Sequence, residues 1–380
     1  MATVSDPRDV RYAFSVEWFD VNAQMNRPYS LFYYTVDDTI EMFDLRNHRM
    51  FLKRCKYPSL RLADLFVGAS VVVFARQLKV TGYADDFTRS QLDTRKEKTC
   101  AIIKPHCYEK IGVILEAFQQ AGLVVAHMRS LKLTRDQLAE GFQHLHEQPT
   151  FSELLDSMAE DFAVALELVG PNAVRALQDL AGPANPEEAR ARAPTSLRAR
   201  YGRDGAQNAV HVSATADAAE REIRFFLGSP FPATATCRDC TLCCVLPHAH
   251  AAGHTGAILN TILEEGFEVS AIELTQLDRA NASEFLEVYR TVVPEYTSMV
   301  DELCNGPVVV CEVRGENVVP SFRELCGPVD PEVAKHIRPQ SVRARWGESK
   351  IRNAVHCTDL PEDGVLECEY FFRILPTHPL

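Results

Sequence analysis

Two kinds of hydrophobic pattern divide the chain. In residues 1–91, short runs rich in aromatic and β-branched residues predict strands, separated by turn-like sequences such as Asp37-Asp38. The expected strands cover residues 12–19, 29–35, 39–43, 50–53 and 70–74, and a short helix is expected over 62–66. Residues 1–91 are therefore predicted to form a β-rich barrel or sandwich.

Beyond residue 96, strand-like and helix-like patterns alternate. Val113, Leu115 and Phe118 recur with helical spacing, and Gly122 is a typical helix stop before the next apolar run. The expected strands cover residues 99–103, 123–126 and 162–168, and the expected helices cover 112–120, 134–142, 151–158, 174–180 and 219–226. The intervening stretch from 181 to 218 is expected to be irregular. This part of the chain is therefore predicted to mix helices and strands.

Three short motifs occur twice, each pair at an offset of 145 residues. They are Gly-Pro-Ala-Asn-Pro at 182–186 and Gly-Pro-Val-Asp-Pro at 327–331, Ser-Leu-Arg-Ala-Arg-Tyr-Gly at 196–202 and Ser-Val-Arg-Ala-Arg-Trp-Gly at 341–347, and Asn-Ala-Val-His at 208–211 and 353–356. Copies of this length indicate tandem domains rather than a solenoid. We place repeat 1 at residues 96–228 and repeat 2 at 240–375, joined by the Pro-rich linker 229–236.

Charge and hydropathy exclude several classes of protein. The net charge of −12 argues against general nucleic-acid binding, and residues 1–91 are close to neutral, so the repeats carry the negative charge. No apolar run is long enough to span a membrane, and the polar start of the chain has no signal-peptide pattern. We therefore expect a cytoplasmic protein with reduced cysteines and neither a membrane nor a nucleic-acid partner.

One cysteine cluster has metal-like spacing. Cys237, Cys240 and Cys243 form a C-x-x-C-x-x-C pattern, which is found in zinc sites, but no second ligand pair follows at a suitable distance. Cys243 and Cys244 also open an apolar run that predicts a buried strand. The favoured interpretation is buried thiols and no metal site, with zinc as the alternative.

The repeated polar residues suit phosphoryl transfer. A histidine such as His211 is a nucleophile near neutral pH, and Glu222 is a candidate to hold its other ring nitrogen. Arg198 and Lys104 would neutralise a transferring phosphate. The second copy keeps the histidine, asparagine, arginine and glutamate in the same register, which strengthens this hypothesis.

The motif order Ile-Lys-Pro, Gly-Pro-x-(Asn/Asp)-Pro, Ser-x-Arg-x-x-(Tyr/Trp)-Gly and Asn-x-x-His resembles nucleoside diphosphate kinases over both repeats. The resemblance implies a ferredoxin-like βαββαβ fold for each repeat and an α+β chain overall. It also implies ping-pong transfer of the γ-phosphate of ATP or GTP to nucleoside diphosphates through a phosphohistidine, with Mg²⁺ on the nucleotide. By this resemblance His211 is the phosphohistidine and Glu222 its carboxylate partner. The nucleotide-binding positions of repeat 1 fall on Lys104, Phe142, Arg198, Asn208 and Ser213, and the degenerate second site on Arg323, Arg343, Asn353, His356, Thr358 and Glu367.

Both repeats depart from the family pattern. In repeat 1, Phe142 replaces a tyrosine, and Gln178, Ala184, Thr150 and His106 replace the first phosphate arginine, a threonine, the base-stacking phenylalanine and an aspartate. In repeat 2 the replacements are Leu246 for the lysine, His248 for the aspartate, Val329 for the threonine and Leu286 for the tyrosine. Because charged hydrogen bonds contribute about 1.5–3 kcal/mol each, we expect weak nucleotide binding or His211 phosphorylation in repeat 1 and inactivity in repeat 2.

Residues 1–91 resemble the DM domain of ciliary proteins, a pleckstrin-like β-fold. The residues that carry this resemblance are Phe-Ser-Val-Glu-Trp-Phe-Asp at 14–20, Leu-Phe-Tyr-Tyr at 31–34, Ile-Glu-Met-Phe-Asp at 40–44, Phe-Leu-Lys-Arg at 51–54 and Leu-Phe-Val-Gly at 65–68. A DM domain before two kinase repeats resembles a ciliary subgroup of the kinase family. That implies a structural component of axonemal doublet microtubules, lying in their lumen, with tubulin, other doublet proteins and the γ-tubulin ring complex as partners.

A basic stretch in the N-terminal domain fits such a partner. It consists of Arg46, His48, Arg49, Lys53, Arg54 and Lys56, interleaved with Phe51 and Tyr57. Tubulin is acidic, so this face is a candidate docking surface, although charges on a solvated hairpin explain the pattern as well. Two other functions stay open: an active phosphotransferase, and a nucleotide sensor without turnover.

Overall fold

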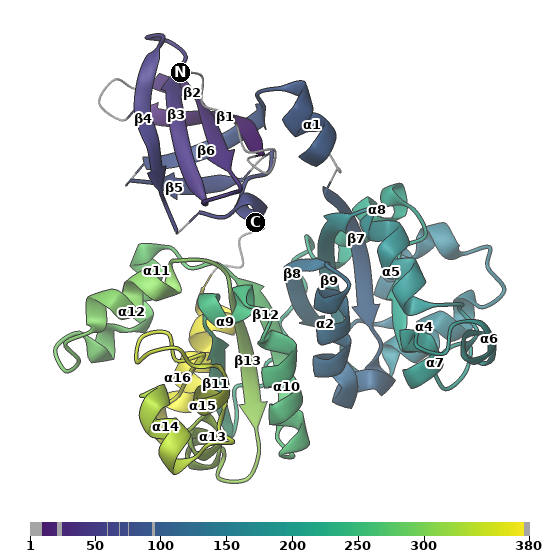
Figure 1. Cartoon of the computed structure of the whole chain (residues 1–380). Helices are drawn as coiled ribbons and strands as arrows, with labels where there is room; N and C mark the ends of the chain where they lie inside the picture. Colours follow the sequence, from purple (N-terminus) through teal and green to yellow (C-terminus); the bar gives the residue numbers. More distant parts are fainter. Residues whose placement is uncertain are drawn as a thin grey trace. The chain divides into compact units, whose positions relative to one another are not determined.

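The computed structural model describes residues 10–20, 25–58, 60–67, 69–74, 76–92 and 96–375. Contacts divide the chain into an N-terminal unit, residues 1–96, and a second unit, residues 97–380, that contains both repeats. Figure 1 shows the strands of the N-terminal unit in purple to blue, repeat 1 in blue to teal and repeat 2 in green to yellow. None of the described helices is both long and apolar enough to cross a membrane.

The N-terminal unit is an antiparallel sheet with a pleckstrin-like order, as expected. The strands are β1 (Arg11–Asp20), β2 (Met25–Tyr34), β3 (Thr39–Asp44), β4 (Arg49–Lys56), β5 (Ser70–Val73) and β6 (Arg76–Tyr83), in the spatial order β4-β3-β2-β1-β6-β5. Their alternating apolar residues face a common core that includes Phe14, Leu31, Ile40 and Leu78. Helix α1 (Asp86–Leu92) follows β6, and the backbone N–H of Ala13 donates to its Thr88 hydroxyl at 2.7 Å.

Repeat 1 has the ferredoxin-like arrangement. Its strands are β7 (Lys96–Ile103), β8 (Val124–Leu131), β9 (Ala163–Pro171) and β10 (Val210–Val212), ordered β10-β7-β9-β8. Its helices are α2 (Ile111–Gln120), α3 (Arg135–Gly141), α4 (Phe151–Ala159), α5 (Ala173–Ala181), α6 (Pro186–Arg192), α7 (Leu197–Tyr201) and α8 (Ala216–Phe226). One core lies between the sheet and α2 with α5, and another between the sheet and α3, α4 and α8. The short β10 carries His211 and pairs with β7.

Repeat 2 repeats this arrangement. Its strands are β11 (Cys240–Val245), β12 (Glu268–Thr275), β13 (Val308–Arg314) and β14 (Val355–Cys357), ordered β12-β13-β11-β14. Its helices are α9 (Pro247–Ala251), α10 (Thr255–Glu264), α11 (Arg279–Phe285), α12 (Tyr296–Leu303), α13 (Val318–Cys326), α14 (Pro331–Ile337), α15 (Val342–Trp346) and α16 (Gly364–Glu369). His356 on β14 therefore holds the position that His211 holds on β10.

The two repeats join edge to edge into one continuous 8-stranded sheet through β8 and β12. Helices α2 and α10 cross so closely that a Cβ added at Gly112 would lie 2.5 Å from the backbone oxygen of Gly256. The linker between the repeats packs along this seam, because Thr234 Oγ1 lies 2.7 Å from Ser130 Oγ and donates to the carbonyl of Ser270. The repeats are therefore parts of one packed unit.

Some elements were absent from the sequence-based expectation. Strand β6 and helix α1 lie beyond the last strand expected in the N-terminal domain. The stretch expected to be irregular between 181 and 218 contains α6, α7 and β10. Helices α6 and α7 begin with the side chains of Asn185 and Ser196, which accept hydrogen bonds from the first turns of those helices. These caps stabilise helices too short for a hydrophobic period to reveal.

Candidate functional site

The centre of the repeat 1 site is a histidine held by a buried carboxylate. Nε2 of His211 lies 2.9 Å from Oε1 of Glu222, which comes from α8 and is completely buried. The hydroxyl of Ser213 donates to the other oxygen of Glu222 at 2.5 Å. Phe142 packs edge-on against the His211 ring, with centroids 4.7 Å apart. These four residues come from three separated segments, and the fold brings them together.

This geometry selects one tautomer of His211. The Glu222 carboxylate accepts a hydrogen bond from Nε2–H, so Nδ1 keeps its lone pair and is the nucleophilic nitrogen. Burial acts to raise the pKa of Glu222, but the charge and hydrogen bonds of His211 and Ser213 hold that pKa below its ordinary value. The carboxylate is therefore ionised at neutral pH and keeps the imidazole oriented.

The two cationic side chains of the repeat 1 site, Lys104 and Arg198, are hydrogen-bonded to backbone carbonyls of the same repeat. The Lys104 ammonium donates to the carbonyl of Ala206 at 2.6 Å. The Arg198 guanidinium donates to the carbonyls of Gly182, at 2.7 Å, and Val210. Burial lowers the pKa of Lys104 to about 7 and that of Arg198 to about 10, and in Lys104 the charge of Arg198 acts in the same direction. A phosphate would have to compete with these internal contacts.

Repeat 2 keeps the same central pair. Nε2 of His356 lies 3.1 Å from Oε2 of Glu367, to which the Thr358 hydroxyl donates at 2.7 Å. Burial acts to lower the pKa of His356, but the Glu367 carboxylate raises it above its ordinary value. Arg343 donates to the carbonyls of Gly327 and Val355, as Arg198 does in repeat 1.

A cavity of about 490 Å³ opens beside His356, and Leu246, Tyr289, Val329, Arg343 and Asn353 are among the residues that line it. Leu246 and Val329 contribute apolar groups at the positions that the resemblance assigns to the phosphate-contacting lysine and threonine. The cavity therefore lacks an ammonium and a hydroxyl that would donate to a triphosphate at those two positions, and it suits a triphosphate less well.

Arg323, which the resemblance assigns to phosphate binding, already has an anionic partner. It forms an ion pair with Asp359, just after β14. The hydroxyl of Tyr289 donates to the other oxygen of Asp359 at 2.5 Å. The equivalent of Arg323 in repeat 1 is Gln178, which donates to the carbonyls of Ser213 and Ala214.

The side chains of the remaining predicted residues form hydrogen bonds with backbone groups of the same repeat. The side-chain amide of Asn208 donates to Ala184 at 2.9 Å, and that of Asn353 donates to Val329 at 3.4 Å. The two histidines at the family's aspartate position also act alike. Nε2 of His106 accepts from the backbone N–H of Ala209, and Nε2 of His248 accepts from that of Ala354, both at 3.2 Å.

Three residues near the two sites were not anticipated. His144 brings its Nε2 within 3.0 Å of the same Glu222 oxygen that holds His211. Tyr289 and Asp359 form the network at Arg323 described above. Leu286 directly follows α11 as Phe142 directly follows α3, so it stands at the position expected of it. The Phe285 and Tyr289 rings lie 5.0 and 6.4 Å from the His356 ring.

The cysteine triad does not converge. Cys240 and Cys244 pack on one face of β11, whereas Cys243 packs on the opposite face with Val245. Side chains two apart on a strand share a face, and those three apart do not. The buried strand expected at Cys243 and Cys244 is confirmed, but it begins at Cys240. Cys237, Cys240 and Cys243 as one ligand set are excluded.

Comparisons with known proteins agree with these observations. The family model described as nucleoside diphosphate kinase matches residues 97–230 and 239–375. A model described as the nucleoside diphosphate kinase 7 N-terminal PH domain matches residues 6–94. The chain is 46% identical over 369 residues to nucleoside diphosphate kinase homolog 7 of Rattus norvegicus, covering 96% of this chain and 93% of that one, and is equally similar to the Mus musculus protein.

A single repeat also has bacterial relatives. Nucleoside diphosphate kinase of Aquifex aeolicus is 36% identical over 132 residues, which cover 35% of this chain and 92% of the relative. A crystal structure of the Aquifex aeolicus enzyme aligns with 34% of this chain and 93% of its own, with a TM-score of 0.33.

Proposed function

The chain belongs to the nucleoside diphosphate kinase family, and from that premise we propose that it is a structural component of ciliary or flagellar doublet microtubules, located in their lumen, with its repeats serving chiefly as binding modules. One observation carries the proposal. The candidate phosphate-binding cations of both repeats are already bound to groups of this chain: Lys104, Arg198 and Arg343 to backbone carbonyls and Arg323 to Asp359.

The physical reason is competition. A triphosphate must replace these internal hydrogen bonds. Its binding free energy therefore includes only the difference between the cation–phosphate contacts that form and the internal contacts that break. The residues missing from each repeat reduce that gain further. What the fold retains is a rigid, continuous sheet of two packed repeats, which suits a structural role.

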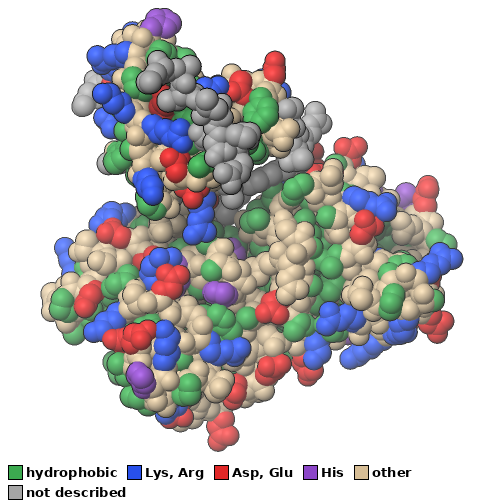
Figure 2. All heavy atoms as spheres, in the orientation of Figure 1, with side chains coloured by type: hydrophobic (Ala, Val, Ile, Leu, Met, Phe, Trp, Pro, Cys, Tyr) green, Lys and Arg blue, Asp and Glu red, His purple; other side chains and the backbone are tan. Residues whose placement is uncertain are grey.

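The N-terminal unit offers a docking surface for an acidic partner such as tubulin. Arg49, Lys53 and Lys56 are exposed on the edge strand β4 and form no ion pair with any described residue, whereas Arg54 pairs with Asp37 at 2.9 Å. Lys and Arg side chains gather on the part of the N-terminal unit where β4 lies (Figure 2). Opposed charges of this kind favour association with an acidic surface.

Binding to purified ciliary doublets and to tubulin tests this role. We expect the full chain to bind, and the triple variant Arg49→Glu, Lys53→Glu and Lys56→Glu to bind about 10- to 100-fold more weakly, from roughly 0.5–1 kcal/mol for each lost contact. The matched control reverses three exposed charges on repeat 1, Lys110, Arg200 and Arg221, which likewise form no ion pair with any described residue. No binding by the unaltered chain would exclude the proposal, and equal weakening by both variants would exclude the β4 surface.

A second function is favoured by the His211 geometry. Nδ1 of His211 attacks the γ-phosphorus of a Mg²⁺–nucleoside triphosphate, the bond between that phosphorus and the β,γ-bridging oxygen breaks, and the nucleoside diphosphate leaves. Another diphosphate then takes the phosphoryl group from the histidine. Glu222 holds the Nε2 proton of His211 throughout.

For the structural role, the γ-tubulin ring complex remains a further candidate partner beside tubulin.

Incubation with γ-labelled ATP separates the two functions. Acid-labile label that is lost in His211→Ala and retained in His356→Ala would support phosphotransfer by repeat 1. Absence of label in the unaltered, folded chain would exclude it without affecting the structural role. Rapid formation of GTP from GDP, abolished by His211→Ala, would instead make catalysis the main function.

A further inference from the structure

Glu312, in the middle of β13, is a buried carboxylate held by hydrogen bonds from uncharged groups. Its side chain is completely buried. It accepts from the backbone N–H groups of Thr236 and Cys237, both at 2.6 Å, and from the hydroxyls of Thr236, at 3.2 Å, and Ser270, at 2.9 Å. The two backbone contacts, one to each oxygen, can only be accepted, which fits the ionised carboxylate. Within the described part of the chain, no Lys, Arg or His forms an ion pair with it, although burying an unpaired charge is costly.

In repeat 1 the equivalent glutamate is paired with a lysine, which repeat 2 lacks. Glu167 on β9 is the counterpart of Glu312, and the ammonium of Lys98 lies 2.5 Å from its Oε1. Lys98 precedes Lys104 by six residues, and Cys240 precedes Leu246 by six. Lys104 and Leu246 are equivalent, because each donates its backbone N–H to the alanine before the last strand of its repeat. Repeat 2 has therefore kept the carboxylate and replaced its cation with the thiol of Cys240.

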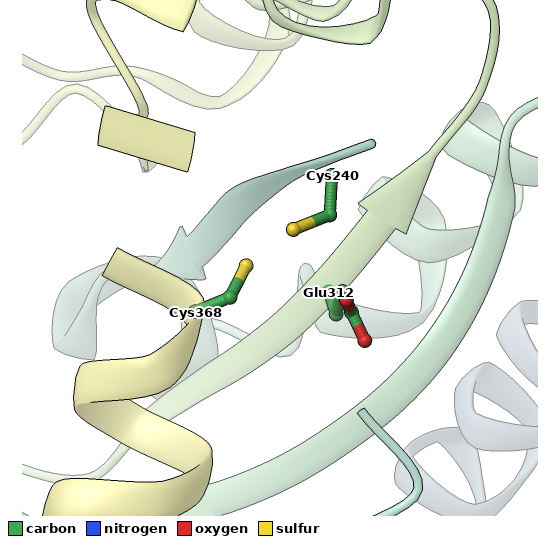
Figure 3. Close-up of side chains that lie close together, drawn as sticks. All are labelled: Cys240, Glu312 and Cys368. Atoms are coloured by element: carbon green, nitrogen blue, oxygen red, sulfur yellow. The ribbon is translucent and has the colours of Figure 1, made fainter. Parts of the chain in front are cut away.

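A second thiol faces the first. Cys368 on α16 follows Glu367, at the position that Ile223 occupies in repeat 1. Its sulfur, the sulfur of Cys240 and a carboxylate oxygen of Glu312 all lie within 4.8 Å of one another, and all three residues are buried. Figure 3 shows the two sulfur atoms directed toward each other between β11 and α16, with Glu312 beside them on β13.

We propose that Cys240, Cys368 and Glu312 bind a zinc ion, which supplies the positive charge that Lys98 supplies in repeat 1. Two thiolates and a carboxylate are ordinary zinc ligands. Zinc displaces one proton from each thiol, and both protons pass to solvent, so no oxidant or reductant is needed. Cys237 precedes Cys240 at C-x-x-C spacing and packs in the same core cluster, but its thiol is not among the three ligand atoms that lie within 4.8 Å of one another. The ion would tie α16, which carries Glu367, to the central strands of repeat 2.

Metal titration of the reduced, metal-free full chain tests this site. We expect one Zn²⁺ per chain and, with Co²⁺ as the probe, thiolate-to-cobalt charge-transfer absorption. Cys368→Val and Cys240→Lys should each weaken metal binding by at least about a hundredfold, since even changes outside the ligand set cost about 10–100-fold. Cys55→Ser, which alters a half-buried thiol of the N-terminal unit, should bind as the unaltered chain does.

Cys240→Lys separates loss of a ligand from loss of the fold. It restores the lysine–glutamate pair of repeat 1, so we expect a folded protein whose melting temperature no longer responds to zinc. Three results would overturn the proposal: no stoichiometric metal binding by the unaltered chain, undiminished binding by Cys368→Val, or a Cys240–Cys368 disulfide in the freshly isolated protein. The last would make the two thiols a redox pair instead.

Discussion

Asp359 holds Arg323 in an ion pair at the mouth of the second site, where the resemblance expects this arginine to contact phosphate. Tyr289 donates to the same carboxylate and limits its movement. A nucleotide phosphate must therefore displace an internal anion from its own binding residue. This pair makes the weak phosphate binding expected of repeat 2 testable.

Asp359→Asn should release Arg323. We expect Mg-ADP to bind repeat 2 about 3- to 10-fold more tightly, because a neutral amide competes less well with phosphate for the guanidinium. Calorimetry on the full chain measures the change, and Glu362→Gln, which removes an exposed carboxylate nearby, is the control. An unchanged isotherm would show that the missing lysine at Leu246, rather than the ion pair, limits binding.

The buried ammonium of Lys104 should make stability depend on pH. Its folded pKa of about 7 lies below the ordinary value of 10.5, so between these values the unfolded chain binds the proton and the folded chain does not. The free energy of unfolding should therefore rise with pH across this window and be lowest below pH 7. Urea unfolding at several pH values should show this rise in the unaltered chain and in Lys110→Met, and a flatter profile in Lys104→Met.

Glu222→Gln should impair histidine phosphorylation without removing the nucleophile. The amide no longer carries the charge that holds the Nε2 proton, so the tautomer with a free Nδ1 loses its preference. We expect labelling of His211 to fall at least about tenfold. The same change at Glu367 in repeat 2 should leave labelling unaltered, and equal loss in both variants would argue against a local effect at His211.

Gly112→Ala tests the contact between the repeats. An added Cβ meets the backbone of α10 at 2.5 Å, so α2 and α10 must move apart. We expect a loss of about 1–3 kcal/mol in the free energy of unfolding, as for other overpacked contacts. Gly205→Ala, where a Cβ meets no atom within 4 Å, should change stability by much less. Equal stabilities would indicate that the two helices can separate at little cost.

The repeat organisation and most elements were predictable because their signals are local. The apolar spacing of Val113, Leu115 and Phe118 reports the buried face of α2, and Cys243-Cys244 reports a buried strand. Helices α6 and α7 were not predicted because they have only 7 and 5 residues, fewer than two turns each, and depend on caps. The zinc alternative for the C-x-x-C-x-x-C spacing fails because a strand directs Cys240 and Cys243 to opposite faces.

Sequence alone determined that the chain holds two copies of one phosphotransfer-like motif set, with His211 and His356 in register, because motif order and apolar periodicity are properties of neighbouring residues. Tertiary structure alone decided that Asp359 engages Arg323, that His144 reaches Glu222, and that Cys368 faces Cys240. These partners are far apart in sequence, and strand pairing and helix packing bring them together. Composition and residue spacing do not predict which side chains, distant in sequence, come into contact in the folded protein.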